Sequence, residues 1–313
     1  MANDAAPWLT GFDEFRAREI DPIIGELEAA RHEARNAALK RASWFIPLAL
    51  LGVGLVWLYL PGDFLIFAAF VAVGGSWAFI QHPIIRHQKV VKEKLVTRLC
   101  GFFGLDFCLV PRHDPIPELR RVGLLPSHNR DGREDQVSGV YEGVRLEMTD
   151  LHLRQVSGSG KNKRDVTVFR GPVFSFSFAK RFHGTTIIKA DATVIGNWFG
   201  SIGMGDMERV RLEDPEFEKC FEVYGTNQVE ARYLLTPGFM QQLIELRNSL
   251  GSKMQAAFDG DSLYIAANNG QDHFEVQGYS GKAVNVQLDR FVGDIGILFR
   301  IIRTLNLESK TRL

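Results

Sequence analysis

The sequence predicts an α+β protein, with a two-helix transmembrane hairpin followed by an antiparallel-sheet domain. Two long apolar runs, Ala42–Leu60 and Phe64–Ile80, are separated by only three residues. In Phe174–Phe178, phenylalanine alternates with serine, which is the period-two pattern of a half-buried strand. The apolar residues of Val286–Asn306 recur at helical spacing, so an amphipathic helix is expected to close the domain.

The two apolar runs have the composition of membrane-spanning helices. Neither contains a Lys, Arg, Asp or Glu residue, and each approaches the roughly 20 apolar residues that cross a hydrocarbon core of about 30 Å. We therefore predict that residues 42–85 form a transmembrane hairpin with its turn at Pro61–Asp63. A hairpin that enters one leaflet and returns has the same charge pattern, and a buried hairpin of a soluble protein is the third interpretation.

Basic residues flank the hairpin on both outer sides. They are Arg35, Lys40 and Arg41 before the first run, and Arg86, Lys89, Lys92, Lys94 and Arg98 after the second. Cationic residues beside membrane helices are retained on the cytoplasmic side, and the turn carries only the anionic Asp63. The sequence thus predicts a multi-pass protein of the inner (plasma) membrane with both termini in the cytoplasm.

The remaining chain divides by composition into helical flanks, a linker and one larger domain. The expected boundaries are 1–41 for a cytoplasmic N-terminal helix, 42–85 for the hairpin, 86–110 for a juxtamembrane helix, 111–136 for a linker and 137–313 for a cytoplasmic α+β domain. Asp21-Pro22 has the residue types of an N-cap and a first helical position, so the N-terminal helix is expected to start there. Pro111–Arg121 contains three prolines and no apolar period, which is typical of a loop.

Turn residues divide the larger domain into strands. Glu142-Gly143 lies between two strand-like runs, and Asp259-Gly260 is a hairpin signal. Thr185–Ala190 is rich in β-branched residues, and Gly184 is expected to join it to the preceding strand as a hairpin. Grouped strands and helices indicate an antiparallel sheet. Strands that end in an amphipathic helix are also similar to a pleckstrin-homology-like barrel.

Two helix starts are indicated by a capping residue followed by proline. Asp214-Pro215 begins a short helix, and Thr236-Pro237 begins a longer one that ends at Gly251. The segments Phe221–Tyr224 and Ala231–Leu235 are predicted to be strands.

Charge and cysteine content exclude several classes of function. The chain has 37 basic and 37 acidic residues, so no broad basic face is expected and nucleic acid is not an expected partner. Cys100, Cys108 and Cys220 lack the spacing of a zinc site and are odd in number, so neither zinc nor a disulfide framework is predicted. A thiol paired in space with a distant histidine is the remaining catalytic interpretation of these cysteines.

Three segments between residues 212 and 237 resemble the signature of a known family. They read LEDPEFEK at Leu212–Lys219, FEVY at Phe221–Tyr224 and QVEARYLLTP at Gln228–Pro237. On these motifs the chain resembles the bacterial family known as domain of unknown function 3137, over about residues 137–306. Members share the layout of membrane segments followed by a cytoplasmic α+β domain. The resemblance implies no activity, catalytic residue or cofactor.

The candidate binding residues within this signature are Tyr224, Glu230 and Arg232. Glu230 and Arg232 lie two apart on the predicted strand and so on one of its faces, where they are available to a polar ligand. The structural interpretation is a salt bridge, or caps to neighbouring backbone, that fixes the helix starting at Pro237. No catalytic residue, metal ligand or cofactor is assigned.

We therefore predict a membrane-anchored, non-enzymatic interaction or scaffold protein. Its expected partners are the lipid bilayer and either a protein or the membrane surface, with assembly of several copies as a further expectation. The alternative is an enzyme that acts on a lipid or membrane-bound substrate, with Tyr224, Glu230 and Arg232 near its site. The enzyme predicts a deep pocket where these groups converge, whereas the binding protein predicts a shallow groove or an exposed apolar patch.

Overall fold

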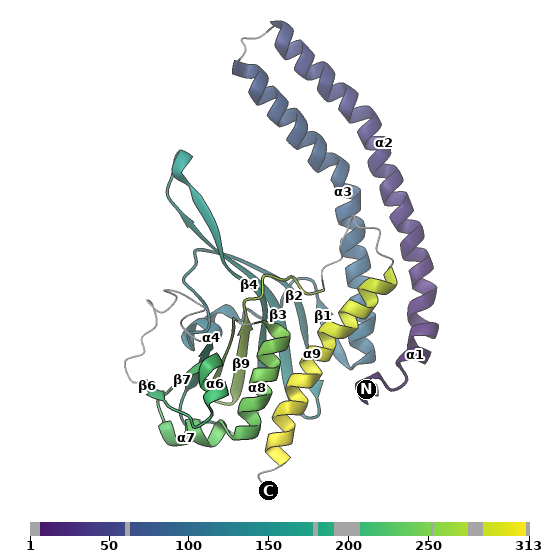
Figure 1. Cartoon of the computed structure of the whole chain (residues 1–313). Helices are drawn as coiled ribbons and strands as arrows, with labels where there is room; N and C mark the ends of the chain where they lie inside the picture. Colours follow the sequence, from purple (N-terminus) through teal and green to yellow (C-terminus); the bar gives the residue numbers. More distant parts are fainter. Residues whose placement is uncertain are drawn as a thin grey trace. The chain divides into compact units, whose positions relative to one another are not determined.

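The computed structural model describes residues 7–59, 63–177, 181–190, 207–251, 253–274 and 284–310. The chain divides into two compact units. One contains Met1–Arg98 and Glu275–Arg290, and the other contains Leu99–Phe274 and Phe291–Leu313. Figure 1 shows both, with the helical hairpin in purple and blue.

The N-terminal helix starts earlier than the sequence predicted. After a 3-10 turn at Pro7–Leu9, α1 (Phe12–Phe15) begins at Gly11 and continues through a π-helical turn, Arg16–Ile20, into α2 (Asp21–Tyr59). The predicted start at Asp21-Pro22 is therefore wrong. The Asp21 N–H bonds to the Arg16 carbonyl, five residues back, so the helix widens immediately before Pro22, which has no N–H to donate.

Helices α2 and α3 (Asp63–Phe102) lie side by side in Figure 1. The rings of Phe45 and Phe79 stack with centroids 4.3 Å apart. Within the described residues, one segment, His32–Tyr59, is long and apolar enough to cross a membrane, and none of its most apolar window is buried. The described residues thus contain one candidate membrane helix, and the predicted two-helix transmembrane hairpin is not confirmed. Many side chains of Phe64–Ile80 lie outside the description.

The second unit is built on one antiparallel sheet. Its strands are β1 (Leu105–Cys108), β2 (Arg130–Tyr141), β3 (Val144–Ser157), β4 (Arg164–Ser177), β5 (Thr186–Ala190), β6 (Glu208–Val210), β7 (Phe221–Gly225), β8 (Met254–Asp259) and β9 (Ser262–Ala267). Their order is β1-β2-β3-β4-β9-β8-β5-β7-β6. The described strands thus form an open sheet with β1 and β6 at its edges, which differs from the closed barrel considered above. The sheet begins within the segment expected to be juxtamembrane helix.

Helices cover both faces of the sheet. They are α4 (Ile116–Arg121), α6 (Pro215–Cys220), α7 (Gln228–Leu234), α8 (Pro237–Leu250) and α9 (Val284–Lys310). On one face, Ile116 and Leu119 of α4 belong to a buried cluster with Leu151 and Leu153 of β3. On the other, α8 contacts β8 through its Phe239 ring, and α9 contacts β2 through Phe299, whose ring centroid is 4.2 Å from that of Tyr141.

Predicted turns and caps are largely confirmed, but strand partners are not. Glu142 and Gly143 have φ values of 49° and 81° and form the tight turn between β2 and β3. The predicted hairpin at Gly184 is wrong, because β4 pairs with β3 and β9, whereas β5 pairs with β7 and β8. The loop predicted at Pro111–Arg121 contains α4, a single short helix with too few turns to show a period.

Candidate functional site

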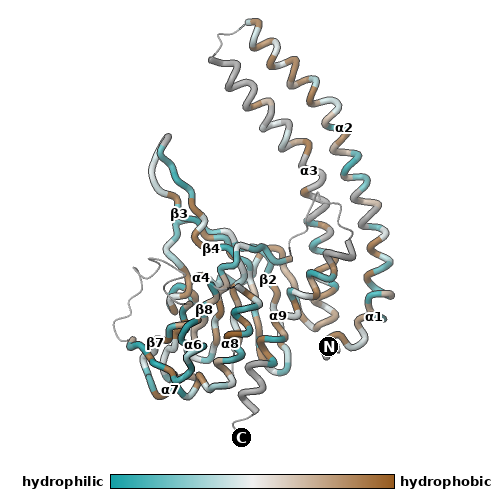
Figure 2. Tube along the Cα trace, viewed as in Figure 1, coloured by the Kyte–Doolittle hydropathy of each residue, from teal (hydrophilic) through white to brown (hydrophobic). Residues whose placement is uncertain are grey.

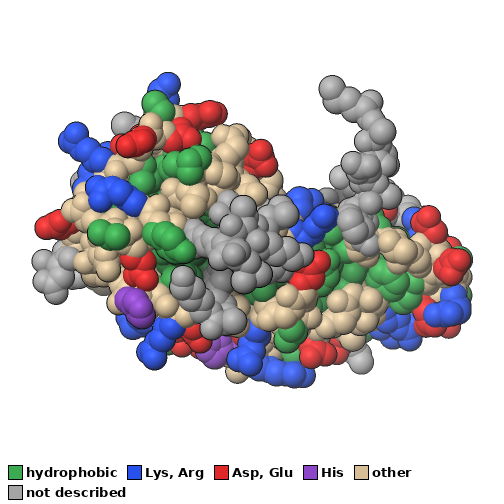
Figure 3. Space-filling view, turned by 90° about the horizontal axis from the view of Figure 1, so that it is seen from below, with side chains coloured by type: hydrophobic (Ala, Val, Ile, Leu, Met, Phe, Trp, Pro, Cys, Tyr) green, Lys and Arg blue, Asp and Glu red, His purple; other side chains and the backbone are tan. Residues whose placement is uncertain are grey.

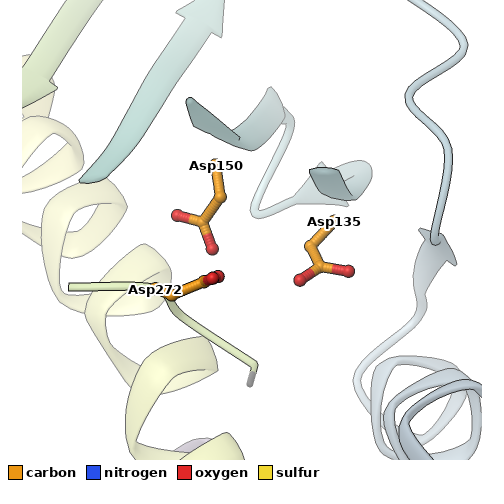
Figure 4. A group of neighbouring side chains, drawn as sticks. All are labelled: Asp135, Asp150 and Asp272. Atoms are coloured by element: carbon orange, nitrogen blue, oxygen red, sulfur yellow. The ribbon is translucent and has the colours of Figure 1, made fainter. Parts of the chain in front are cut away.

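Three aspartates gather inside the sheet domain. Asp135, Asp150 and Asp272 each present a carboxylate oxygen, and these oxygens lie within 4.8 Å of one another. Asp135 and Asp150 are 1% and 6% exposed. Figure 4 shows the Asp150 and Asp272 carboxylates facing each other, with Asp135 beside them. We call these three residues the aspartate cluster.

An irregularity in β2 directs Asp135 towards the cluster. Glu134 pairs with Asp150 and Gln136 with Thr149, so Asp135 is the extra residue of a β-bulge and has a φ of 54°. A bulge re-aims the side chain of its extra residue, and aspartate tolerates this left-handed conformation better than most residues. Asp150 lies on the face of β3 opposite to Leu151, because side chains alternate along a strand.

The loop after β9 carries Asp272 to the same place. The Asn268 side chain accepts a hydrogen bond from the Arg170 N–H at 3.1 Å and donates one to the Val168 carbonyl at 3.2 Å. The Gly270 N–H bonds to the Arg170 carbonyl at 2.9 Å. The Arg170 guanidinium then lies 3.3 Å from Asp272 Oδ2. These bonds fix the loop across β4 and hold Asp272 over the sheet.

The environment of Asp150 disfavours its charge. Burial, followed by the neighbouring charges of Asp272 and Asp135, raises the pKa of Asp150 well above its ordinary value, although a hydrogen bond from the His273 N–H opposes this. That bond is to Oδ2 and is 2.8 Å long. The other oxygen, Oδ1, is buried and has no hydrogen-bond partner in the part of the chain that the structure describes.

A second buried pair connects the aspartate cluster to α9. His273 Nδ1 lies 2.8 Å from Asp294 Oδ1, and the Phe274 N–H donates to Asp294 Oδ2 at 3.3 Å. The side chains of His273 and Asp294 are 5% and 10% exposed. One residue, His273, therefore bonds to the aspartate cluster through its backbone and to α9 through its ring.

Chemically, the aspartate cluster offers only oxygen ligands. Such a group holds either a proton shared between carboxyls or a hard cation such as Ca²⁺ or Mg²⁺. The sequence did not reveal it, because its members come from a bulge, a strand and a loop far apart in the chain. A β-bulge and a long-range loop have no spacing signature.

The three residues predicted to bind a ligand form hydrogen bonds to different partners. Tyr224 donates from its hydroxyl to Glu222 at 3.0 Å, and Arg232 donates to Gln228 at 3.1 Å. Glu230 accepts from the backbone N–H groups of His183 and Gly184. Each of these bonds has a different partner. Glu230 bonds to backbone N–H groups 46 and 47 residues away, whereas the helix that starts at Pro237 is capped by Thr236.

The segment that carries Glu230 and Arg232 is a helix, so the predicted strand at Ala231–Leu235 is wrong. The Asn227 side chain caps α7 by accepting from the N–H groups of Val229 and Glu230, both at 3.1 Å. Residues two apart on a helix point in different directions, so Glu230 and Arg232 do not share a face.

Two further features bear on the enzymatic alternative. Burial, with a smaller effect of Asp106, raises the pKa of Cys100 to about 12, so this thiol is a poor nucleophile at neutral pH. A small cavity is lined by Pro115, Leu119, Glu147, Thr149, Val173, Phe174, Ser175 and Tyr264. None of the three predicted binding residues lines this cavity.

The fold and the aspartate cluster together define a class of protein: an α+β sheet domain joined to N-terminal helices, one of them apolar enough to cross a membrane. Residues 167–307 match the model of the family described as Protein of unknown function (DUF3137). This match confirms the resemblance inferred from residues 212–237.

Other comparisons add a distant structural likeness. No curated protein matches the sequence. Among solved structures, the chain is similar to the mycobacterial trehalose monomycolate transport factor A, TtfA, at 9% identity and a TM-score of 0.38. That match covers 68% of this chain and 95% of the other.

Proposed function

We propose that the protein is a membrane-anchored interaction protein of the inner membrane, in which α2 and α3 form the anchor and the sheet domain binds a partner in the cytoplasm. The observation that carries the proposal is the exposed apolar surface of α2. Trp44, Leu50 and Trp57 are 81%, 68% and 70% exposed. Figure 2 shows the brown, apolar part of this helix. Water disfavours an apolar surface of this extent, whereas lipid accommodates it.

Contacts between α2 and α3 support a hairpin anchor. Besides the stacked rings of Phe45 and Phe79, Arg41 Nη1 donates to the Phe79 carbonyl at 3.1 Å. Arg41 directly precedes the first apolar run and Phe79 is the second-last residue of the second, so the contacts join the outer ends of the two runs. Cations flank both ends, which favours the topology with both termini in the cytoplasm.

A membrane extraction experiment tests the anchor. The full chain is expressed, membranes are isolated, and they are washed at alkaline pH to remove peripheral proteins. We expect the protein to stay in the membrane pellet. A Leu50→Arg/Val53→Arg variant is expected to shift towards the soluble fraction, since each central charge costs about 2.5–3.5 kcal/mol of insertion. A Val140→Arg/Val166→Arg variant, with two charges on exposed strand positions, is the control. Full release of the unchanged chain would contradict the proposal.

The long hairpin of β3 and β4 supports a binding role for the sheet domain. Strand β2 begins at Arg130, which pairs with Arg154 of β3. Beyond this point β3 continues to pair with β4 alone, as far as the pair Ser157 and Arg164. In Figure 1 this ribbon projects past the rest of the sheet. Its tip carries Lys161, Lys163 and Arg164, whereas Figure 3 shows positive and negative side chains interspersed over the face seen there. A projecting cationic tip suits an anionic surface on a membrane or a protein.

Co-purification in mild detergent tests this binding role. The tagged full chain is compared with a Lys163→Glu/Arg164→Glu variant and with a Lys219→Glu/Lys253→Glu control, and bound proteins and phospholipids are both identified. We expect a component that is retained by the unchanged chain and the control but lost from the tip variant. Equal recovery of all components from the three samples would contradict a role for the ribbon tip.

A further inference from the structure

We infer that Asp135, Asp150 and Asp272 form a binding site for one divalent cation with a preference for oxygen ligands, and that Ca²⁺ fits it better than Mg²⁺. The inference is independent of the proposed anchor and partner. It concerns a site inside the sheet domain that the sequence did not indicate.

The first argument is the chemistry of the three side chains. Three carboxylates converge from β2, β3 and the loop after β9, and two of the three residues are almost fully buried. Buried acidic side chains are rarely left unpaired, since an isolated buried carboxylate is strongly destabilising. Carboxylate oxygens are the ligands that Ca²⁺ and Mg²⁺ prefer.

The second argument is the unpartnered oxygen of Asp150. Oδ2 is occupied by the His273 N–H at 2.8 Å, whereas Oδ1 is buried and has no hydrogen-bond partner among the residues described. A buried acceptor without a donor costs about 1–3 kcal/mol. A cation bound among the three carboxylates provides the missing partner and favours the ionised form of Asp150.

The third argument is the separation of the ligand atoms. Oxygens bound to one Ca²⁺ lie about 3.3–5 Å apart, because Ca–O distances are about 2.3–2.6 Å. The oxygens of the aspartate cluster lie within 4.8 Å of one another, a limit that is below the upper end of the Ca²⁺ range and above the upper end of the Mg²⁺ range. Oxygens around Mg²⁺ lie about 3–4 Å apart, because its bonds are shorter at about 2.0–2.1 Å. The larger ion therefore needs less movement of the side chains.

A bound cation would also hold residues 272–274. Asp272 and His273 are adjacent, and His273 is bonded to both Asp150 and Asp294. A cation shared by β2, β3 and this loop thus joins the sheet to the residues that position Asp294. A cation that binds the folded chain and not the unfolded chain stabilises the folded state by mass action.

Calorimetric titration of the chelator-stripped full chain in detergent tests the site, with Ca²⁺ and Mg²⁺ titrated separately. We expect one Ca²⁺ per chain, a lower affinity for Mg²⁺, and thermal unfolding at a higher temperature when Ca²⁺ is present. In Asp150→Asn the Ca²⁺ affinity is expected to fall at least about 10-fold. Asp272→Asn, at the less buried member, is expected to show the same loss. Asp261→Asn, which changes a carboxylate at the β8–β9 turn, is the matched control and should keep the affinity of the unchanged chain.

The outcomes separate a cation site from a shared proton. No saturable Ca²⁺ binding up to about 1 mM would overturn the proposal and favour carboxyl groups that share a proton. Unchanged affinity in both folded cluster variants, or saturable binding of Mg²⁺ without binding of Ca²⁺, would overturn it as well. Far-ultraviolet circular dichroism establishes that each variant is folded. Asp272 is less buried than Asp150, so the test can still be made with Asp272→Asn if Asp150→Asn does not fold.

Discussion

The Arg41 guanidinium donates a hydrogen bond to the backbone carbonyl of Phe79 at 3.1 Å. Its carbon also lies 4.7 Å from the centroid of the Phe79 ring. The sequence explains why this carbonyl is available. Residue 83 is proline, which has no N–H to donate to the carbonyl four residues before it. Arg41 of α2 thus replaces the helical bond that Pro83 removes from α3.

Replacing Arg41 is expected to weaken the hairpin. Arg41→Leu leaves the Phe79 carbonyl, which also lacks its helical donor, without this exposed bond. We expect a loss of about 0.5–1.5 kcal/mol, the net range for an intramolecular hydrogen bond. Denaturant unfolding of the full chain in detergent measures it. Lys40→Leu removes the adjacent cation and is the control, with an expected change within about 0.5 kcal/mol. Equal effects of the two substitutions would assign the loss to charge rather than to this bond.

Glu230 and Arg232 are expected to differ in their effect on stability. Glu230→Ala removes the acceptor for the His183 and Gly184 N–H groups at 2.9 and 2.6 Å, so we expect a loss of about 1–3 kcal/mol. Arg232→Ala removes only an exposed bond to Gln228, with an expected change within about 0.5 kcal/mol. Chemical denaturation of each variant compares them. A larger effect of Arg232→Ala would argue against the structural role assigned to Glu230.

Gly171 is expected to be required where the loop after β9 crosses β4. Its φ is 148°, and a side chain there would collide with the Ala267 carbonyl and with Asn269 Oδ1. Gly171→Ala is therefore expected to destabilise the domain by more than about 1 kcal/mol. Gly260→Ala is the matched control, because Gly260 also has positive φ but nothing lies within 4 Å of the added carbon. Thermal unfolding that ranks the two variants in the opposite order would contradict this account.

His113 is expected to make stability depend on pH. A hydrogen bond with Glu147 at 3.0 Å raises the pKa of His113 in the folded protein. Burial opposes this increase, and the charges of nearby acidic groups add to it. A histidine pKa that is raised on folding stabilises the folded chain. The stabilisation is complete at pH values below the pKa of the unfolded chain, about 6.5, and is lost as the pH rises through the pKa of the folded chain. Melting temperatures should fall over this window in the unchanged chain and fall less in His113→Gln. Parallel curves would exclude the effect.

Asp150 is expected to make stability fall with rising pH, as His113 does, but the fall starts at a lower pH. Its pKa is raised in the folded protein, so the folded chain binds a proton that the unfolded chain releases above about 3.9. Stability without metal should fall as pH rises from that value through the folded pKa. Asp150→Asn in chelator removes this decline and is expected to be more stable than the unchanged chain at neutral pH. A less stable folded variant across the whole range would contradict the pKa direction.

Local features of the fold could be predicted because they depend on neighbours in the sequence. Asp214 and Thr236 cap α6 and α8 as predicted, and each is followed by proline at the first helical position. In contrast, β5 joins β7 and β8 through long connections, which no local signal specifies. The strand predicted at Ala231–Leu235 failed because the capping role of Asn227 was not recognised.

The aspartate cluster could not be predicted for a related reason. Asp150 follows Thr149 in a strand whose alternation suggests only a half-buried sheet, and nothing local requires Asp135 to occupy a bulge. The cluster depends on strand register, a bulge and a loop held by Arg170. These are tertiary features, and they place together residues that a motif search treats as unrelated.

The topology of the anchor tests most directly whether the hairpin spans the membrane. Single cysteines are introduced at Asp63, in the turn region, and at Ser127, in the sheet domain, in a chain whose three native cysteines are replaced by serine. Intact cells are then treated with a maleimide that does not cross membranes. For a spanning hairpin we expect labelling at position 63 and no labelling at position 127 until the membrane is opened. Protection of both positions in intact cells, with labelling of both after opening, would contradict a hairpin that spans the membrane.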